Sequence, residues 1–309
     1  MDQAFGIKLP GLVPGYARTF RDLPDLVVEL EALGYDDVWD GEHILFGPVM
    51  PHPGGAGNMV HGRTEKRSDR ADTMIMFAAI AARTSTIKMY SSVILAAAHN
   101  FAILARQAAT LDVISNGRFV LGVGMGWFAK EFVAMGIPPK ERDERLEEVI
   151  RACQELWSPG LSSFEGMYIK FQDVLSEPAP VTPGGVPVWW GGNAIEGPTA
   201  RRIATLGHGW LSREAADYDE VARSIEGIRK ACADVGRDPD EIGYRASISP
   251  TPPEEGPIER RPLDDVVEEY VAYGSRLADL GITHFNIPAN YLQFEVEELG
   301  QLLVALRRA

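Results

Sequence analysis

Short apolar segments alternate with amphipathic segments along the whole chain, and this alternation is the feature that most constrains its fold. A short apolar run bounded by turn residues is typical of a buried strand, whereas apolar residues three and four apart are typical of one face of a helix. Repeated strand–helix units indicate a parallel sheet covered by helices. The expected strands are Phe5–Leu9, Asp37–Trp39, Ile87–Ile94, Phe119–Val123, Val186–Trp190, Gly209–Leu211, Ile242–Ser247 and His284–Ile287.

Each expected strand is followed by a helical pattern. The expected helices are Leu23–Leu33, Thr73–Ala82, Ala102–Ile114, Lys140–Trp157, Thr199–Ala204, Tyr218–Val235, Leu263–Leu280 and Val296–Leu306. Eight strand–helix units in 309 residues predict an α/β fold of the (βα)8 TIM-barrel type, with residues 1–309 forming a single domain rather than an open doubly wound sheet. Barrels of this type carry their chemistry at the C-terminal ends of the strands.

Three segments interrupt the repeat, near residues 45–72, 162–183 and 250–262. The first is rich in glycine, proline, histidine and arginine, the second contains the hairpin-like sequence FEGMYIKFQDV, and the third is rich in proline and acidic residues. Long loops in compact domains often act as lids over an active site. We expect all three as insertions on or near the C-terminal face of the barrel.

The charge balance limits the partners of the protein. The chain has 30 lysine and arginine residues against 44 aspartate and glutamate residues, a formal net charge of −14, which is unsuited to nucleic acid and to anionic membranes. No apolar run is long enough to span a bilayer, and the N-terminus lacks the pattern of a secretory signal. Cys153 and Cys232 occupy apolar positions of helical patterns, so we expect both to be buried packing residues. Together with the missing signal and membrane span, this predicts a cytoplasmic location.

The stretch RFVLGVGMGWFAKEF places Gly122, Gly124 and Gly126 between an apolar run and the start of a helical pattern. From Gly124 to Ala129 it matches the pattern G-x-G-x-x-A of dinucleotide-binding turns. That fold also needs an acidic residue about twenty positions later, at the end of a second strand, and here this window falls inside the helical pattern ERLEEVIRACQELW. In a barrel the same glycines end the fourth strand, where they either admit a ligand to the backbone or form a tight turn without one.

The runs ATLDVISNGRFVLGVGMGW, KEFVAMG and ERLEEVIRACQELW resemble the luciferase-like monooxygenase superfamily, particularly its branch of deazaflavin (coenzyme F420)-dependent oxidoreductases. The run PVWWGGN followed by GPTARRIATLGHGWL is similar to the fifth strand and phosphate-binding region of the same family. The resemblance implies hydride transfer between bound F420 and a small organic substrate. An FMN-dependent monooxygenase that uses molecular oxygen fits the same barrel, and a flavin-binding barrel without catalytic activity is a third alternative.

The resemblance also implies that the cofactor ring lies across the barrel mouth, beside the ends of the third and fourth strands. A cis peptide bond that does not involve proline is expected in the segment that supports the ring, between Ser92 and Val93. The start of the fifth expected helix is expected to bind the phosphate, because N–H groups are free there. The positions that match cofactor contacts of the family are Ser92, Val93, Met125, Gly126, Trp127, Gly191, Gly192, Asn193, Gly197, Pro198 and Thr199.

The second strand ends in VWDGEHI, and the resemblance implies catalytic roles for Glu42 and His43. A histidine beside a carboxylate can exchange protons near neutral pH. Gly41 can break the alternation of the strand, so that both side chains face the pocket. Without the resemblance, the pair would indicate a solvated loop. The other histidines are expected to be packed or solvated, and none has the spacing of zinc ligands, so we expect no metal site.

The segment MIMFAAIAA is apolar nearly all round, which is more than one buried face of an outer helix requires. Barrels of the resembled family commonly pair through helices on one flank. The sequence therefore predicts a homodimer through the second and third helices.

Overall fold

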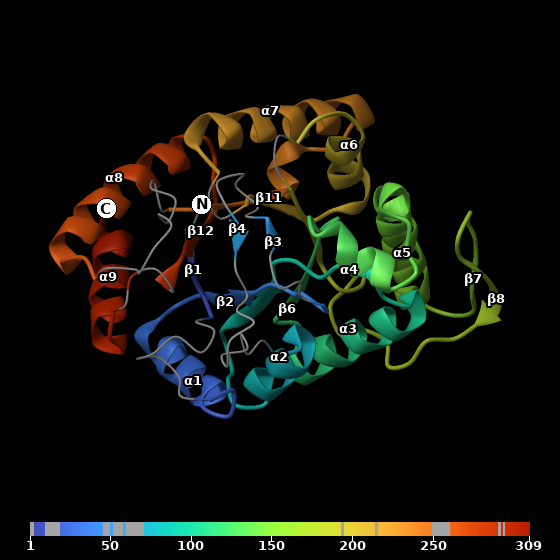
Figure 1. Cartoon of the computed structure of the whole chain (residues 1–309), viewed down its shortest axis with the longest axis horizontal. Helices are drawn as coiled ribbons and strands as arrows, with labels where there is room; N and C mark the ends of the chain where they lie inside the picture. The colour runs from blue at the N-terminus through green and yellow to red at the C-terminus, as the bar shows by residue number, and fades with distance from the viewer. Residues whose placement is uncertain are drawn as a thin grey trace.

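Eight parallel strands form a closed barrel at the centre of the molecule (Figure 1). The computed structural model describes residues 3–9, 19–45, 50–51, 58–59, 71–192, 195–213, 216–248, 260–289, 292 and 294–309. The barrel strands are β1 (Ala4–Lys8), β2 (Asp37–Asp40), β5 (Lys88–Ser91), β6 (Phe119–Val123), β9 (Val188–Gly191), β10 (Gly209–Leu211), β11 (Gly243–Ser247) and β12 (His284–Ile287). Their order around the barrel is β1–β12–β11–β10–β9–β6–β5–β2, and β2 pairs with β1 to close it. This confirms the predicted (βα)8 barrel.

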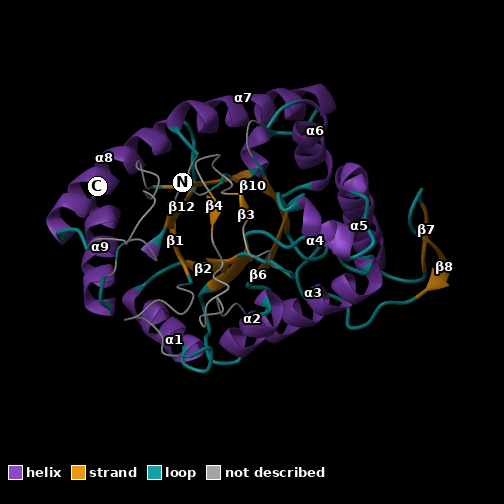
Figure 2. Cartoon of the chain, viewed as in Figure 1, coloured by secondary structure: helices purple, strands orange, loops and turns teal. Residues whose placement is uncertain are grey.

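The helices form a ring outside the strands, as Figure 2 shows. They are α1 (Leu23–Leu33), α2 (Thr73–Ala81), α3 (Phe101–Ser115), α4 (Ala129–Ala134), α5 (Arg142–Trp157), α6 (Gly197–Leu206), α7 (Tyr218–Val235), α8 (Leu263–Asp279) and α9 (Val296–Arg308). Among the helices of the described residues, α4 is the one that the sequence did not predict, because a helix of 6 residues is too short to show a helical period.

Two separate cores surround and fill the barrel. The outer core lies between strands and helices, and α5 contributes Leu146, Val149, Ile150 and Cys153 to it from one face. Burial raises the pKa of the Cys153 thiol, which keeps it protonated and inert. The inner core contains strand residues only, namely Trp39, Tyr90, Val120, Trp189 and Leu211. The interior is therefore packed with side chains, and it closes the barrel beneath its mouth.

A buried ion pair lies among the inner aromatic side chains. Nη2 of Arg245 donates to Oδ1 of Asp37 at 2.5 Å, and Nε donates to the side chain of Asn286. The guanidinium carbon lies 4.5 Å from the centre of the Tyr90 ring. Charged groups this deeply buried need such partners, because an unpaired charge is costly to remove from water.

The insertion near residues 162–183 forms the predicted hairpin. Strands β7 (Ser162–Glu165) and β8 (Lys170–Val174) pair antiparallel and extend away from the barrel beyond α5 (Figure 1). The Tyr168 hydroxyl donates to Glu144 near the start of α5 at 2.9 Å, and the Phe171 ring stacks on Phe101 at the start of α3. The hairpin is thereby held against the first turns of two helices, and its role as a lid stays a prediction.

The other two insertions follow strands β2 and β11 in the chain. The first contains the short antiparallel pair β3 (Met50–Pro51) and β4 (Asn58–Met59). The remainder of its residues 46–70 and residues 249–259 of the third insertion lie outside the described residues. Within the described ranges, no helix is both long enough and apolar enough to cross a membrane.

Candidate active site

Apart from the three residues of the predicted phosphate site, the predicted site residues lie at or after the C-terminal ends of four strands that are neighbours in the barrel, β2, β5, β6 and β9. Residues 41–43 follow β2, residues 92–93 follow β5 and residues 124–127 follow β6, while residues 191–192 end β9. Because the four strands are parallel and adjacent, these segments meet along one side of the barrel mouth. Asn193 lies outside the described residues.

Val93 lies two residues after the end of β5 and packs against two glycines. The Ser92–Val93 peptide bond is cis, which confirms the expectation. A Cβ atom added to Gly124 would lie 2.7 Å from Cγ2 of Val93, and one added to Gly191 would lie 2.5 Å from Cγ1 of Val93. A side chain at either glycine would therefore displace Val93. This close packing explains why two strand ends carry glycine, and it fixes a half-buried apolar side chain at the mouth.

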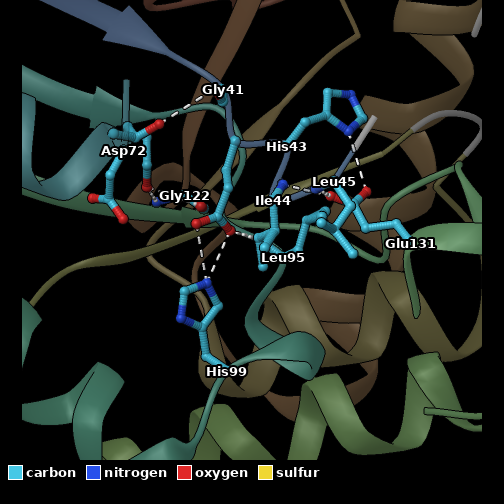
Figure 3. Close-up of polar contacts among 12 residues, drawn as sticks. Gly41, His43, Ile44, Leu45, Asp72, Leu95, His99, Gly122 and Glu131 are labelled. Carbon is cyan, nitrogen blue, oxygen red and sulfur yellow. Dashed lines mark hydrogen bonds and ion pairs between the residues drawn. The ribbon is translucent and has the colours of Figure 1, made fainter. Parts of the chain in front are cut away.

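His43 does contact a carboxylate, but the carboxylate belongs to Glu131 rather than to Glu42 (Figure 3). Glu131 lies on α4, and its Oε2 is 3.2 Å from Nδ1 of His43. Its Oε1 accepts hydrogen bonds from the N–H groups of Ile44 and Leu45 at 2.5 Å and 2.8 Å. The loop after β2 is thereby attached to the helix after β6.

Glu42 binds His99, which Figure 3 shows on the opposite side of the Gly41–Leu45 segment from His43. The Glu42 carboxylate is 2.9 Å from Nε2 of His99, which follows the short 3-10 helix η1 (Ala96–Ala98), and it accepts the N–H of Leu95 at 2.9 Å. Burial lowers the pKa of His99, but the hydrogen bond and the charge of Glu42 outweigh this effect, so the pKa is raised. Glu42 and His43 thus contact different partners.

The turn after β6 is held by α5. Gly126 has φ +66°, in the left-handed region that favours glycine, and its carbonyl accepts a hydrogen bond from Nη1 of Arg142 at 2.8 Å. The next residue, Trp127, lies edge-on to the His43 ring with 5.3 Å between ring centres. Met125 is exposed beside them. The turn therefore places an aromatic ring against the predicted catalytic histidine.

The expected phosphate site is the N-terminus of α6, where Gly197, Pro198 and Thr199 form the first turn. Gly197 has φ +55°, and no atom lies within 4 Å of a Cβ added to it, so the backbone is open to a ligand. The preceding residue, Glu196, forms no capping hydrogen bond through its side chain. The N–H groups of this turn can therefore hold an anion.

The basic residue nearest to this turn on the buried face of α6 is already paired. Arg202 donates to Asp143 at 2.6 Å and to Glu147 at 2.7 Å, both on α5. Arg202 therefore connects α6 to α5. The positive charge that α6 presents to solvent is that of the exposed Arg201.

His284 behaves as the packed histidine that the sequence predicted. Its ring lies 5.0 Å from the Trp189 ring in the barrel interior. Burial, followed by the positive charges of Arg245 and Lys88, lowers its pKa to about 3, so the ring is neutral at physiological pH. In the described part of the chain, no group of three or more His, Cys, Asp or Glu side chains is placed to hold a metal ion.

Sequence reasoning missed Glu131, His99 and Arg142 as members of the site. The available signal for Glu131 was an acidic residue in the run WFAKEF, directly after the glycine turn. Nothing in the spacing of His99 or Arg142 distinguishes them from ordinary surface residues.

Comparison with known proteins supports this assignment of the fold and of the family motifs. An uncharacterized protein of Mycobacterium tuberculosis (strain ATCC 25618 / H37Rv) is 34% identical over 168 residues, which cover 54% of this chain and 58% of that protein. An F420-dependent glucose-6-phosphate dehydrogenase of Amycolatopsis mediterranei is 30% identical over 225 residues, 70% of this chain and 63% of that protein. An FMNH(2)-dependent dimethylsulfone monooxygenase of Pseudomonas putida is 28% identical over 231 residues, 72% of this chain and 62% of that protein. The matched segments thus span less than two thirds of the length of these relatives.

Among solved structures, the monooxygenase RslO1 from Streptomyces bottropensis is similar in fold, with a TM-score of 0.75 over 99% of this chain and 98% of that chain at 20% identity. Residues 4–254 match the family model described as luciferase-like monooxygenase. Since this match covers most of the chain, the chain belongs to the luciferase-like monooxygenase family.

Proposed function

We propose that the protein is an oxidoreductase that transfers a hydride between bound coenzyme F420 and a small organic substrate, with His43 as the proton-transferring residue. The observation that carries this proposal is the position of His43 and its buried carboxylate partner on the same side of the mouth as Val93 and its two glycines. The 30% identical F420-dependent relative supports the choice of cofactor.

The residues present fit a flat ring that carries a phosphate on a side chain. Val93, which packs against Gly124 and Gly191, offers a half-buried apolar side chain to the ring. The open first turn of α6 offers backbone N–H groups to the phosphate. When bound, the deazaflavin supplies the ring carbon that accepts or donates the hydride. The task of the protein is to orient the substrate and to move the proton.

In the oxidation direction, the His43 ring accepts the proton of the substrate hydroxyl as the hydride leaves the adjacent carbon. In the reduction direction, the same ring donates a proton to the carbonyl oxygen. The Glu131 carboxylate, 3.2 Å from the ring, stabilises the positive charge that His43 carries between these events.

An FMN-dependent monooxygenase that uses molecular oxygen is the second candidate. The 28% identical relative from Pseudomonas putida favours it. A local observation also favours it: Asp143 and Glu147 neutralise Arg202 beside the α6 turn, which leaves little positive charge for the oligoglutamate tail of F420.

Titration of the purified protein with F420 and, separately, with FMN distinguishes the two candidates, with cofactor fluorescence as the signal. We expect F420 to bind at least about tenfold more tightly, a difference of about 1.4 kcal/mol. Tighter binding of FMN, together with substrate-dependent oxygen uptake, would establish the monooxygenase instead. Binding of neither cofactor would contradict the proposed ring and phosphate sites.

Replacement of His43 by alanine tests the proton transfer. The expected result is a loss of turnover of roughly a hundredfold or more, a usual contribution of general acid–base catalysis, with little change in the Kd of the cofactor. Unchanged turnover would remove His43 from the mechanism.

We also propose that the protein forms a homodimer through α2 and α3. A groove of about 230 Å³ lies between these helices, and Met74, Ile75 and Ile114 are among its lining residues. Ile75 is 69% exposed and Ile103 is 54% exposed, although both are large apolar side chains. A second copy of the chain would cover this surface.

A further inference from the structure

Glu131 has the contacts of a carboxylate that fixes the position of another group. Its side chain is 1% exposed, and both oxygens are used: Oε2 contacts Nδ1 of His43, and Oε1 accepts two backbone hydrogen bonds from Ile44 and Leu45. Burial alone would raise the pKa of Glu131, but the hydrogen bonds from His43 and from the two N–H groups outweigh it and lower the pKa. The carboxylate is therefore ionised at neutral pH.

An ionised carboxylate has no hydrogen to donate. The hydrogen in the contact between Glu131 and His43 must therefore lie on Nδ1 of the imidazole. A neutral imidazole carries one hydrogen, so its lone pair is then on Nε2. The contact thus selects one of the two tautomers of His43.

Contacts with α4 and with Trp127 restrict the orientation of the His43 ring. The two N–H groups of Ile44 and Leu45 hold the backbone next to His43 at a fixed distance from α4. Trp127 contacts the ring at an interplanar angle of 80°. The His43 side chain is 13% exposed, so its ring is enclosed without being sealed from solvent.

We propose that Glu131 is a positioning residue that holds His43 as the Nδ1–H tautomer, so that proton transfer takes place at Nε2. The assignment of proton transfer to Nε2 rests on the proposed function of His43, whereas the tautomer follows from the contact alone. In the reaction, Nε2 accepts one proton to give an imidazolium whose Nδ1–H still donates to Glu131, and it returns that proton in the reverse step.

Long-range proton–nitrogen NMR on protein labelled with ¹⁵N-histidine tests the tautomer directly. The chain has 6 histidines, and the signals of His43 are identified by their loss in a His43→Ala variant. We expect hydrogen on Nδ1 and a bare Nε2 in the wild-type protein at pH 8. An Nε2–H tautomer in the wild-type protein would overturn the proposal, whether or not any variant folds.

The variant Glu131→Gln removes the charge and should give His43 signals of both tautomers. The matched control is Glu148→Gln, because Glu148 also accepts backbone N–H groups, those of Met167, Tyr168 and Ile169, but lies on α5 away from His43. This control should keep the wild-type tautomer. A folded Glu131→Gln variant with unchanged His43 signals would overturn the proposal.

Kinetics separate this inference from the proposed function. Where turnover is measurable, Glu131→Gln should lower kcat by roughly a hundredfold with little change in KM, because a histidine in the wrong tautomer binds substrate but transfers the proton poorly. A tautomer change in a protein that has no activity with either cofactor would support the positioning role and contradict the proposed function. A tautomer change with unchanged kcat would exclude Nε2 as the site of proton transfer.

Discussion

Oε2 of Glu42 lies 2.9 Å from Nε2 of His99, and this pair connects the end of β2 to the segment that follows β5. The same carboxylate accepts the N–H of Leu95, and the N–H of Glu42 donates to the carbonyl of Val93 at 3.0 Å. The two side chains are 7% and 18% exposed, so water weakens the pair less than it would at the surface. Glu42 therefore attaches the loop after β2 to the segment that contains Val93.

The free energy of unfolding should depend on pH through His99. The groups that act on His99 are Glu42 and Asp72, and although burial opposes its protonation, they raise its pKa above the usual 6.5. A histidine whose pKa is raised on folding stabilises the fold fully below its unfolded pKa, and this stabilisation is lost as the pH rises through the folded value. Stability should thus decline as the pH rises above about 6.5.

Urea unfolding between pH 6 and 9 measures this decline. His99→Gln should flatten it, and Glu42→Gln should flatten it as well, since each removes one partner of the pair. His284 adds little slope above pH 7, because its pKa of about 3 leaves it neutral in the folded state and the unfolded ring is also mostly neutral there. Parallel slopes for wild type and both variants would contradict the role of the pair.

The packing of Val93 against Gly191 predicts a non-additive pair of substitutions. Gly191→Ala brings a methyl group within 2.5 Å of Cγ1 of Val93, so it should lower the free energy of unfolding by about 1–3 kcal/mol. Val93→Ala removes the colliding methyl groups, and the double variant should therefore lose less than the sum of the two single losses.

A double-mutant cycle in urea checks this prediction. Gly184→Ala serves as a comparison, because no atom lies within 4 Å of a Cβ added there and its cost arises from its φ of +85° alone. Val93→Ala should leave that cost unchanged. If the losses in the free energy of unfolding for the Val93 and Gly191 variants were strictly additive, the two residues would not be in repulsive contact.

The barrel could be predicted from the sequence because each strand and each long helix has its own local hydrophobic period. Helix α5 is an example, with Leu146, Val149, Ile150 and Cys153 on one buried face. The β7–β8 hairpin was recognised from its own sequence in the same way.

The backbone part of the site could be predicted, whereas its side-chain pairs could not. The glycines at positions 124 and 191 and the cis bond after Ser92 belong to local motifs with a family resemblance. The partners of Glu42 and His43 come from 57 and 88 positions further along the chain, and no local pattern encodes such separations. Adjacency in sequence therefore says nothing about these partners, and the loop after β2 directs the two side chains to different elements.

The apolar surface of α2 and α3 leads to a prediction about assembly. Ile75→Asp should shift the protein from dimer to monomer without unfolding it, because Ile75 is 69% exposed within one chain. Light scattering measures the mass, and circular dichroism verifies the fold. Val304→Asp, at a site on α9 that is 46% exposed, should leave the mass unchanged. A wild-type monomer at all practical concentrations would contradict the proposed dimer.

Glu31 predicts a loss of stability in acid. It lies on α1, and its Oε1 accepts the N–H groups of Ser85, Thr86 and Ile87 at 2.9, 2.6 and 2.9 Å, which attaches α1 to the segment entering β5. Burial acts to raise the pKa of Glu31, but these hydrogen bonds outweigh it and lower the pKa to about 2 from 4.5. A carboxylate whose pKa is lowered on folding contributes stability above its unfolded pKa, and this contribution is lost as the pH falls toward the folded value.

Glu31→Gln should therefore lower the free energy of unfolding by about 1–3 kcal/mol at pH 7. The difference from wild type should shrink between about pH 4.5 and pH 2, because protonation then removes the charge from the wild-type side chain as well. Urea unfolding at pH 7, 4 and 3 measures the change, with Glu29→Gln on the exposed face of the same helix as the control. A difference of the same size at all three pH values would mean that Glu31 stabilises the fold through packing, since packing contacts do not respond to its charge.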